Sequence, residues 1–135
     1  MANRGDWYEV ELKQAHLEWG THRYTDSRGI VYGEGYLAIP RNTAEQFKIF
    51  NSNGTNGIDC WGQNIFACYS SDGMYEGVLR AQGNSYAGVV YAKQFSEDKN
   101  LKGIGGWYQS VGATVGGRVR VQWISPDTIE ITYLG

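Results

Sequence analysis

Apolar and polar residues alternate near both ends of the chain, as they do in strands that bury one face. In residues 7–12 the apolar set is Tyr8, Val10 and Leu12. In residues 118–123 Val and Trp alternate with Arg and Gln, and after a turn at 125–127 a further strand covers 129–133. The pattern predicts an N-terminal strand and a C-terminal hairpin.

The middle of the chain predicts further short strands. Residues 35–39 form a strand that Pro40 stops, because proline cannot donate to a ladder. Residues 58–69 and 74–82 form a hairpin around a Ser-Ser-Asp-Gly turn, and residues 89–91 add a brief strand. These segments are expected to form the centre of a sheet.

Helical signals are short and few. Asn42 is a candidate N-cap for residues 43–47, with Glu45 three residues later as in a capping box. Four apolar residues recur later at helical spacing: Leu101, Ile104, Trp107 and Tyr108. They predict a helix over about 98–111. Residues 12–17 either continue the first strand or form a helical turn.

The composition favours many short strands over a helical bundle. The 135 residues include 19 Gly, 10 Tyr and 5 Trp but only 2 Pro, and their number suits one domain over residues 1–135. Four aromatic residues are predicted to be core: Phe47, Tyr91, Trp107 and Trp123. The pattern assigns no role to Tyr36, Trp19 or Trp61.

No stretch approaches the roughly 20 apolar residues that span a bilayer, and the polar start at 1–6 lacks the apolar core of a signal peptide. We therefore expect a soluble, cytoplasmic protein with no membrane partner. Cys60 and Cys68 are expected to be reduced thiols, since a chain of this length builds its own core.

No motif for catalysis, a cofactor or a metal ion is recognisable. His16 and His22 lie far from the cysteines in sequence, so zinc-binding spacing is missing. The glycine-rich stretch at 103–106 does not end in Lys-Ser or Lys-Thr, which a phosphate-binding loop requires. The acidic residues at 127–130 resemble part of a nuclease motif but lack its lysine. We expect a non-catalytic domain without cofactor or metal.

Charge and polarity draw attention to two loops. Residues 20–35 and the stretch that begins at 83 are polar and turn-rich, and are predicted to be exposed. The net charge of −2 argues against nucleic-acid binding, because such domains are usually basic. Residues 80–95, however, contain Arg80 and Lys93 and no acid, so this part of the chain is locally basic.

The order of several motifs resembles one known family. A strand runs into Ile39-Pro40 and the short helix with Ala44 and Phe47, two central strands end at Arg80-Ala81-Gln82-Gly83-Asn84, and a late helix precedes a Gly-rich turn into a Val-rich strand at 112–121. In this order the chain resembles the DNA-binding pseudobarrel family over roughly residues 20–133. That family includes the plant B-three domains and the target-recognition domains of restriction endonucleases such as EcoRII, BfiI and NgoAVII, and the restriction-enzyme branch is the nearer.

The resemblance implies a mainly β fold, a seven-stranded open pseudobarrel with two short helices that straddles the major groove of double-stranded DNA with two arms. The first arm corresponds to residues 22–32 and the second arm to residues 82–93. It also implies a bacterial, nucleoid-associated module of a restriction-modification system, with a nuclease domain or subunit as a further partner.

Side-chain chemistry suggests which residues would contact bases and which would contact phosphates. Arg bonds bidentately to guanine, and Asn and Gln bond to adenine. The candidates for base edges are therefore Arg23, Arg28, Gln82 and Asn84. Phosphate contacts fix register without reading sequence, and the candidates for them are Ser27, Arg80, Ser85, Tyr86 and Lys93.

Three other interpretations stay open. A Gly-, Trp- and Tyr-rich acidic chain is also compatible with a carbohydrate- or small-ligand-binding β-barrel. A reader of a modified, flipped base would need an aromatic cage, for which Trp19 or Trp61 is available. In the third interpretation the chain is part of an enzyme: a fragment or subunit of a restriction system whose nuclease lies on another domain or chain.

Overall fold

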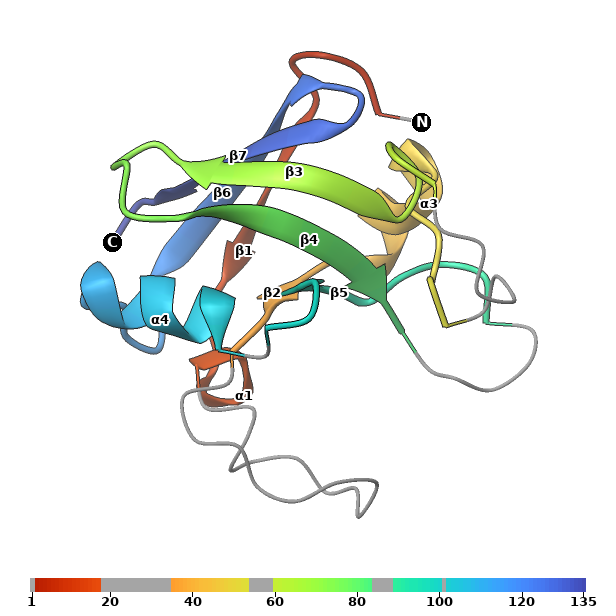
Figure 1. The fold of residues 1–135 in the computed structure, drawn as a ribbon. Coiled ribbons are helices and arrows are strands. Elements are labelled where there is room, and N and C mark those ends of the chain that lie inside the picture. Colours follow the sequence, from red (N-terminus) through yellow and green to blue (C-terminus); the bar gives the residue numbers. More distant parts are fainter. Residues whose placement is uncertain (1, 18–34, 54–59, 84–88, 101) are drawn as a thin grey trace.

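Seven strands form one sheet that curves into an almost closed barrel (Figure 1). The structure is a computed structural model that describes residues 2–17, 35–53, 60–83, 89–100 and 102–135. Its strands are β1 (Trp7–Glu11), β2 (Leu37–Ala38), β3 (Ile65–Ser70), β4 (Glu76–Gln82), β5 (Gln94–Glu97), β6 (Arg118–Ser125) and β7 (Thr128–Tyr133). They follow the order β1-β6-β7-β3-β4-β5-β2, and every neighbouring pair is antiparallel except β3 and β7. The predicted mainly β, seven-stranded open pseudobarrel is confirmed.

The barrel has a seam between β1 and β2, the two edge strands of the sheet. No backbone ladder joins these strands within the described residues. Instead, the Tyr8 hydroxyl on β1 donates a hydrogen bond of 2.9 Å to the Ala38 carbonyl oxygen on β2. One side chain therefore links the edges that the backbone leaves unpaired.

The described part of the chain has three short helices, α1 (Gln14–Leu17), α3 (Arg41–Phe47) and α4 (Gly103–Ser110). The alternative of a helical turn within residues 12–17 is thus the correct one. The longest of the three has 8 residues, and no helix among the described residues is long and apolar enough to cross a membrane.

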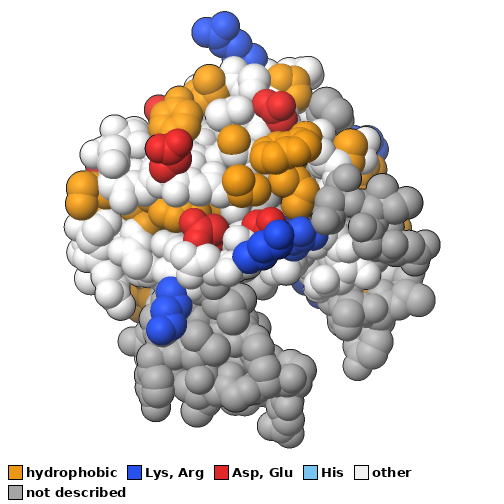
Figure 2. All heavy atoms as spheres, viewed as in Figure 1, with side chains coloured by type: hydrophobic (Ala, Val, Ile, Leu, Met, Phe, Trp, Pro, Cys, Tyr) orange, Lys and Arg blue, Asp and Glu red, His pale blue; other side chains and the backbone are white. Residues whose placement is uncertain are grey.

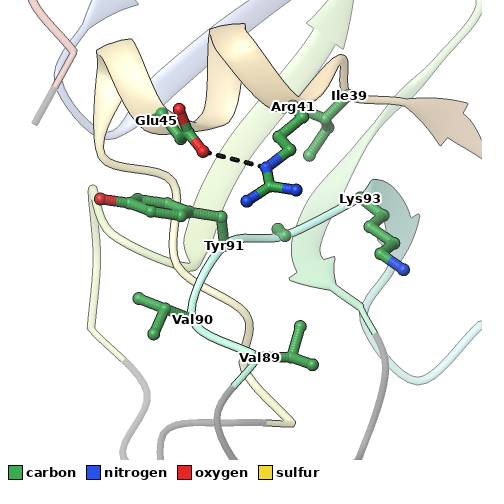
Figure 3. Close-up of a pocket in the computed structure, with 8 residues that line it drawn as sticks. Ile39, Arg41, Glu45, Val89, Val90, Tyr91 and Lys93 are labelled. Atoms are coloured by element: carbon green, nitrogen blue, oxygen red, sulfur yellow. Dashed lines mark hydrogen bonds and ion pairs between the residues drawn. The ribbon is translucent and has the colours of Figure 1, made fainter.

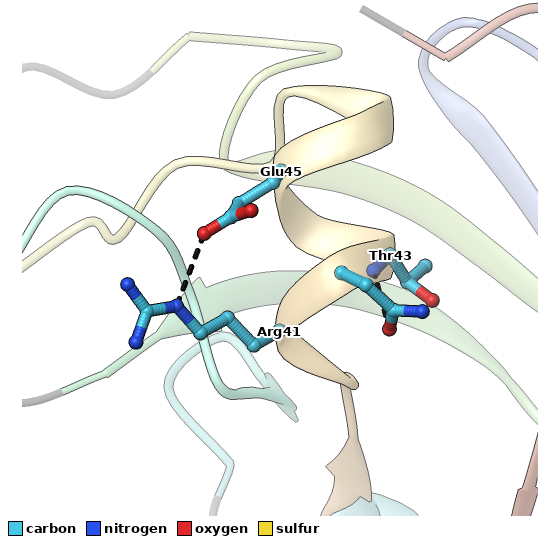
Figure 4. A network of polar contacts seen from close by, with 4 residues as sticks. Arg41, Thr43 and Glu45 are labelled. Atoms are coloured by element: carbon cyan, nitrogen blue, oxygen red, sulfur yellow. Dashed lines mark hydrogen bonds and ion pairs between the residues drawn. The ribbon is translucent and has the colours of Figure 1, made fainter.

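The predicted capping box at the start of α3 is wrong. Pro40, with φ −59°, occupies the N-cap, so the helix begins one residue before Asn42. Asn42 lies inside the helix, where its Oδ1 accepts the Thr43 N–H at 3.0 Å. Glu45 bonds the Arg41 guanidinium at 3.0 Å instead of the backbone (Figure 4).

Two further element boundaries differ from the prediction. The late helix begins at Gly103 and not near 98, because Lys99 takes a left-handed φ of 63° that interrupts helical geometry. The brief strand predicted at 89–91 is a single bridge from Tyr91 to Phe50, and β5 follows only at Gln94. The described part of β3 begins at Ile65, later than the predicted strand.

Aromatic rings fill the centre of the barrel. Trp123 on β6 is fully buried and meets Phe47 and Phe66 edge-on, with ring centroids 5.3 and 6.1 Å apart. Trp107 is also buried, so three of the four predicted core aromatics are confirmed. Tyr91 is only partly buried, because it packs against the edge of the core.

Candidate nucleic-acid interface

The described residues nearest to the two predicted arms lie toward one side of the barrel. The described chain breaks off after α1 at Leu17 and resumes at Gly35, and it breaks off again after β4 at Gly83 and resumes at Val89. Figure 1 shows α1 and the carboxyl end of β4 on the lower side of the barrel, with β2 and β5 between them. A ligand held by both arms would therefore face β2, β5 and the end of β4.

Most of the predicted contact residues lie outside the described residues. These are Arg23, Ser27 and Arg28 of the first arm and Asn84, Ser85 and Tyr86 of the second. Their roles stay predictions. Arg80, Gln82 and Lys93 are described, and all three lie on or beside β4 and β5.

The base of the first arm is a tightly packed backbone contact. The Tyr36 N–H donates to the His16 carbonyl oxygen at 3.1 Å, which ties the two described ends together. The Tyr108 hydroxyl on α4 donates to the Tyr36 carbonyl oxygen at 2.8 Å. A Cβ at Gly35 would lie 2.9 Å from Gly105 Cα, so only glycine allows α4 this close.

His16 is the titratable group at this base. Its Nδ1 accepts the Lys13 N–H at 3.1 Å, and its ring meets Tyr36 edge-on at 5.0 Å. Burial, and after it the charge of Lys13, lowers the pKa of His16 below its ordinary value. The neutral ring is the form that accepts this hydrogen bond.

The base of the second arm is held by β5. Lys93 N–H donates to the Gln82 carbonyl oxygen at 2.8 Å, and the Lys93 carbonyl oxygen accepts the Ile39 N–H at 2.8 Å. The Lys93 side chain is exposed and has no ion-pair partner in the part of the chain that the structure describes.

Two glutamines lie next to each other beside Lys93. Leu79, Ala81 and Phe95 face the core, so the alternate residues of β4 and β5 point outward. Gln82 and Gln94 are direct partners in the β4–β5 register, so their side chains share one face. Both are partly exposed. The pair places two carboxamides side by side on the outer face of the sheet.

The sequence prediction missed Gln94. The expected arm ended at Lys93, and the expected strand lay at 89–91 instead of 94–97. The signal for Gln94 was present, because Phe95 is the first fully apolar ring after the loop and strand alternation then turns its neighbour outward.

Arg80, a predicted phosphate contact, is partly buried and already forms an ion pair. Its Nε lies 3.1 Å from Asp98 Oδ1, and both side chains are 23% exposed. A phosphate at Arg80 would have to compete with this carboxylate. Of the two predicted phosphate contacts that the structure describes, Lys93 is therefore the more exposed.

A hollow of about 680 Å³ lies beside the second arm. It is lined by Ile39, Arg41, Glu45 and residues 89–93, and the Arg41 guanidinium points into it (Figure 3). Val89, Val90 and Tyr91 form an apolar wall opposite the charged residues of α3. This combination suits a ligand with an apolar part and an acceptor group.

Charges are mixed on the described surface. Figure 2 shows acidic and basic side chains scattered around a band of apolar ones, without a continuous basic patch on that face. Among the described residues no three His, Cys, Asp or Glu side chains come close enough to hold a metal ion. Cys60 and Cys68 are free thiols, and Trp61 is 53% exposed.

No family model, curated protein or solved structure matches this chain. The features of the molecule that bear on function are therefore its fold, the described residues next to the two predicted arms, and the side chains of Gln82, Lys93 and Gln94.

Proposed function

We propose that this chain is a sequence-specific module for double-stranded DNA that reads the major groove with two arms and is not catalytic. In this proposal it is the target-recognition domain of a bacterial restriction-modification system and acts in the cytoplasm at the nucleoid. The nuclease belongs to another domain or subunit. The observation that carries the proposal is an open seven-stranded barrel in which Gln82 and Gln94 are paired on neighbouring strands, with Lys93 next to Gln94 in the chain.

The side chains of Gln82, Gln94 and Lys93 support the proposal that the chain recognises DNA bases. A carboxamide donates to adenine N7 or accepts from its N6 amino group, and each good bidentate pair discriminates by about 1–3 kcal/mol. Gln82 and Gln94 are held on paired strands, so their backbone positions are fixed before DNA arrives. Lys93 lies next to Gln94 and is suited to a phosphate that sets the register.

The charge of the chain predicts an unusual salt dependence. The affinity of a DNA-binding protein falls with salt in proportion to the phosphates that its cations neutralise, with a slope of about 0.9 per phosphate. The net charge is −2, and Arg80 is already paired with Asp98. Few phosphates are therefore neutralised, and base contacts must contribute a large share of the binding energy.

The test is fluorescence anisotropy with a pool of randomised duplexes across a salt series, followed by sequencing of the bound fraction. The proposal predicts enrichment of a short motif. Gln82→Ala should relax the preference at one base pair, and Lys93→Gln should weaken all sequences alike and reduce the salt slope by about 1. Lys48→Gln, an exposed lysine at the end of α3, is the matched control and should change neither.

The hollow beside α3 favours a second function, the binding of a carbohydrate or another small ligand. Tyr91 and Val90 give it apolar surface, and Arg41 gives it a donor. This function predicts no binding of the duplex pool even at low salt, but a rise in melting temperature with a matching ligand. A methylated duplex added to the same series separates a third outcome, recognition of a modified, flipped base.

A further inference from the structure

Beyond the paired part of β4 and β5, another segment lies between the two ends of the second arm. The Ser52 N–H donates to the Ala81 carbonyl oxygen at 2.9 Å on the β4 side. On the other side Phe50 forms an antiparallel bridge with Tyr91, and their rings stack with centroids 5.8 Å apart and planes 17° from parallel. Residues 50–53 therefore fill the gap where the two strands diverge.

Asn51 is the residue of this segment that reaches both ends of the arm. It is fully buried, and its N–H donates to the Val90 carbonyl oxygen at 2.8 Å. Its side-chain Oδ1 accepts the Gly83 N–H at 2.8 Å, and its Nδ2 donates to the Val89 carbonyl oxygen at 3.3 Å. A single carboxamide thus bonds Gly83 and Val89, which lie on either side of residues 84–88 in the chain.

Neighbouring groups tighten this arrangement. The Asn51 Oδ1 also accepts the Asn53 N–H at 3.0 Å, and the Asn53 Nδ2 donates to the Gly83 carbonyl oxygen at 3.0 Å. A Cβ at Gly83 would lie 3.2 Å from the Asn51 Cγ and Nδ2, which is closer than a comfortable contact. The glycine lets the backbone approach the buried amide.

We propose that Asn51 is a positioning residue that determines sequence specificity, because it fixes the separation and direction of the two ends of the second arm. The proposal rests on the proposed function. Asparagine suits the role since its side chain accepts from one end and donates to the other; aspartate lacks the donor, and alanine lacks both groups. Without this clamp, base contacts lose their alignment with Gln82 and Gln94, whereas exposed cations still find phosphates.

The variants for the test separate positioning from general stability. Asn51→Asp keeps the acceptor for Gly83 and loses the donor to Val89, and Asn51→Ala removes both. Asn53→Ala removes one exposed bond to Gly83, and serves if the Asn51 variants do not fold. Asn64→Asp is the control, because Asn64 is almost equally buried, its Oδ1 accepts the Cys60 N–H at 2.7 Å, and the substitution keeps its backbone carbonyl oxygen, which accepts the Ala81 N–H.

The first readout is amide hydrogen exchange of the full chain without DNA. Asn51→Ala should speed exchange of the Gly83 amide by at least about tenfold, because that N–H loses its acceptor. The second readout is anisotropy with the selected duplex and with a randomised one. The preference for the selected duplex should fall by about tenfold or more, with affinity for the randomised duplex and its salt slope unchanged.

The outcomes distinguish the positioning role of Asn51 from the proposed function. If the unsubstituted chain prefers a duplex and the Asn51 and Asn53 variants keep that preference, the positioning role is overturned while the proposed function survives. If Asn64→Asp loses the preference to the same extent, the effect is general stability and the positioning role is also overturned. If the unsubstituted chain binds no duplex, the proposed function fails and the specificity role fails with it.

Discussion

Replacing Tyr8 by Phe tests what holds the barrel seam. The change removes the one described hydrogen bond between β1 and β2, from the Tyr8 hydroxyl to the Ala38 carbonyl oxygen at 2.9 Å, and leaves the buried ring in place. A hydrogen bond of this kind contributes about 0.5–1.5 kcal/mol net, and a carbonyl left without its donor adds a desolvation cost. We expect a loss of about 1–2 kcal/mol in the free energy of unfolding.

The expected change is large enough to measure. An unfolding entropy of about 2.1 cal/mol/K per residue gives roughly 0.28 kcal/mol/K for a chain of 135 residues. Tyr8→Phe should therefore lower the melting temperature in calorimetry by about 4–7 °C, with an unchanged slope in urea titrations. Tyr69→Phe removes a hydroxyl from an exposed tyrosine and should stay within about 0.5 kcal/mol of the original chain. A Tyr8→Phe variant as stable as that control would refute the seam argument.

Gly35→Ala should lower the free energy of unfolding in urea by about 1–3 kcal/mol, because its Cβ would meet the Gly105 backbone at 2.9 Å. A Cβ at Gly106 would meet nothing, so Gly106→Ala should stabilise the chain. Equal effects of the two substitutions would contradict this. Since burial lowers the pKa of His16, the contribution of its neutral ring to folding stability is complete above about pH 6.5 and is lost as the pH falls. A pKa at or above 6.5 in an NMR titration of the folded chain would contradict this. Burial raises the pKa of Tyr108, so the contribution of its neutral hydroxyl to folding stability is present below about pH 10 and should be lost as the pH rises further. An absorbance titration in which every tyrosine ionises while the chain is still folded would refute this.

Sequence alternation predicted the strands that separate core from solvent. β1, β6 and β7 each have one buried face, and their apolar residues lie where a period of two places them. Boundaries were less predictable, because single residues decide them. With Pro40 as N-cap, α3 begins earlier than the capping pattern indicated. The left-handed backbone at Lys99 makes α4 begin later than predicted.

The candidate site was predicted in part. Gln82 and Lys93 were named from the motif order and their roles stay predictions, whereas the outward position of Gln94 follows from alternation once β5 is placed. Asn51 could not be predicted, because its partners Gly83 and Val89 are 32 and 38 residues away. Local patterns carry no information on such a contact. Arg80 illustrates the same limit, since its partner Asp98 lies 18 residues further on.

The most direct measurement of the central claim is an NMR titration of the full chain with the duplex selected from the randomised pool. We expect shifts of backbone amides at the two arm bases, Gly35–Tyr36 and Gln82–Gln94, that saturate together. Little change is expected on the outer face of β1 and β6, around Trp7 and Arg120. Shifts confined to that outer face, or none at low salt, would contradict the claim that this barrel reads DNA between two arms.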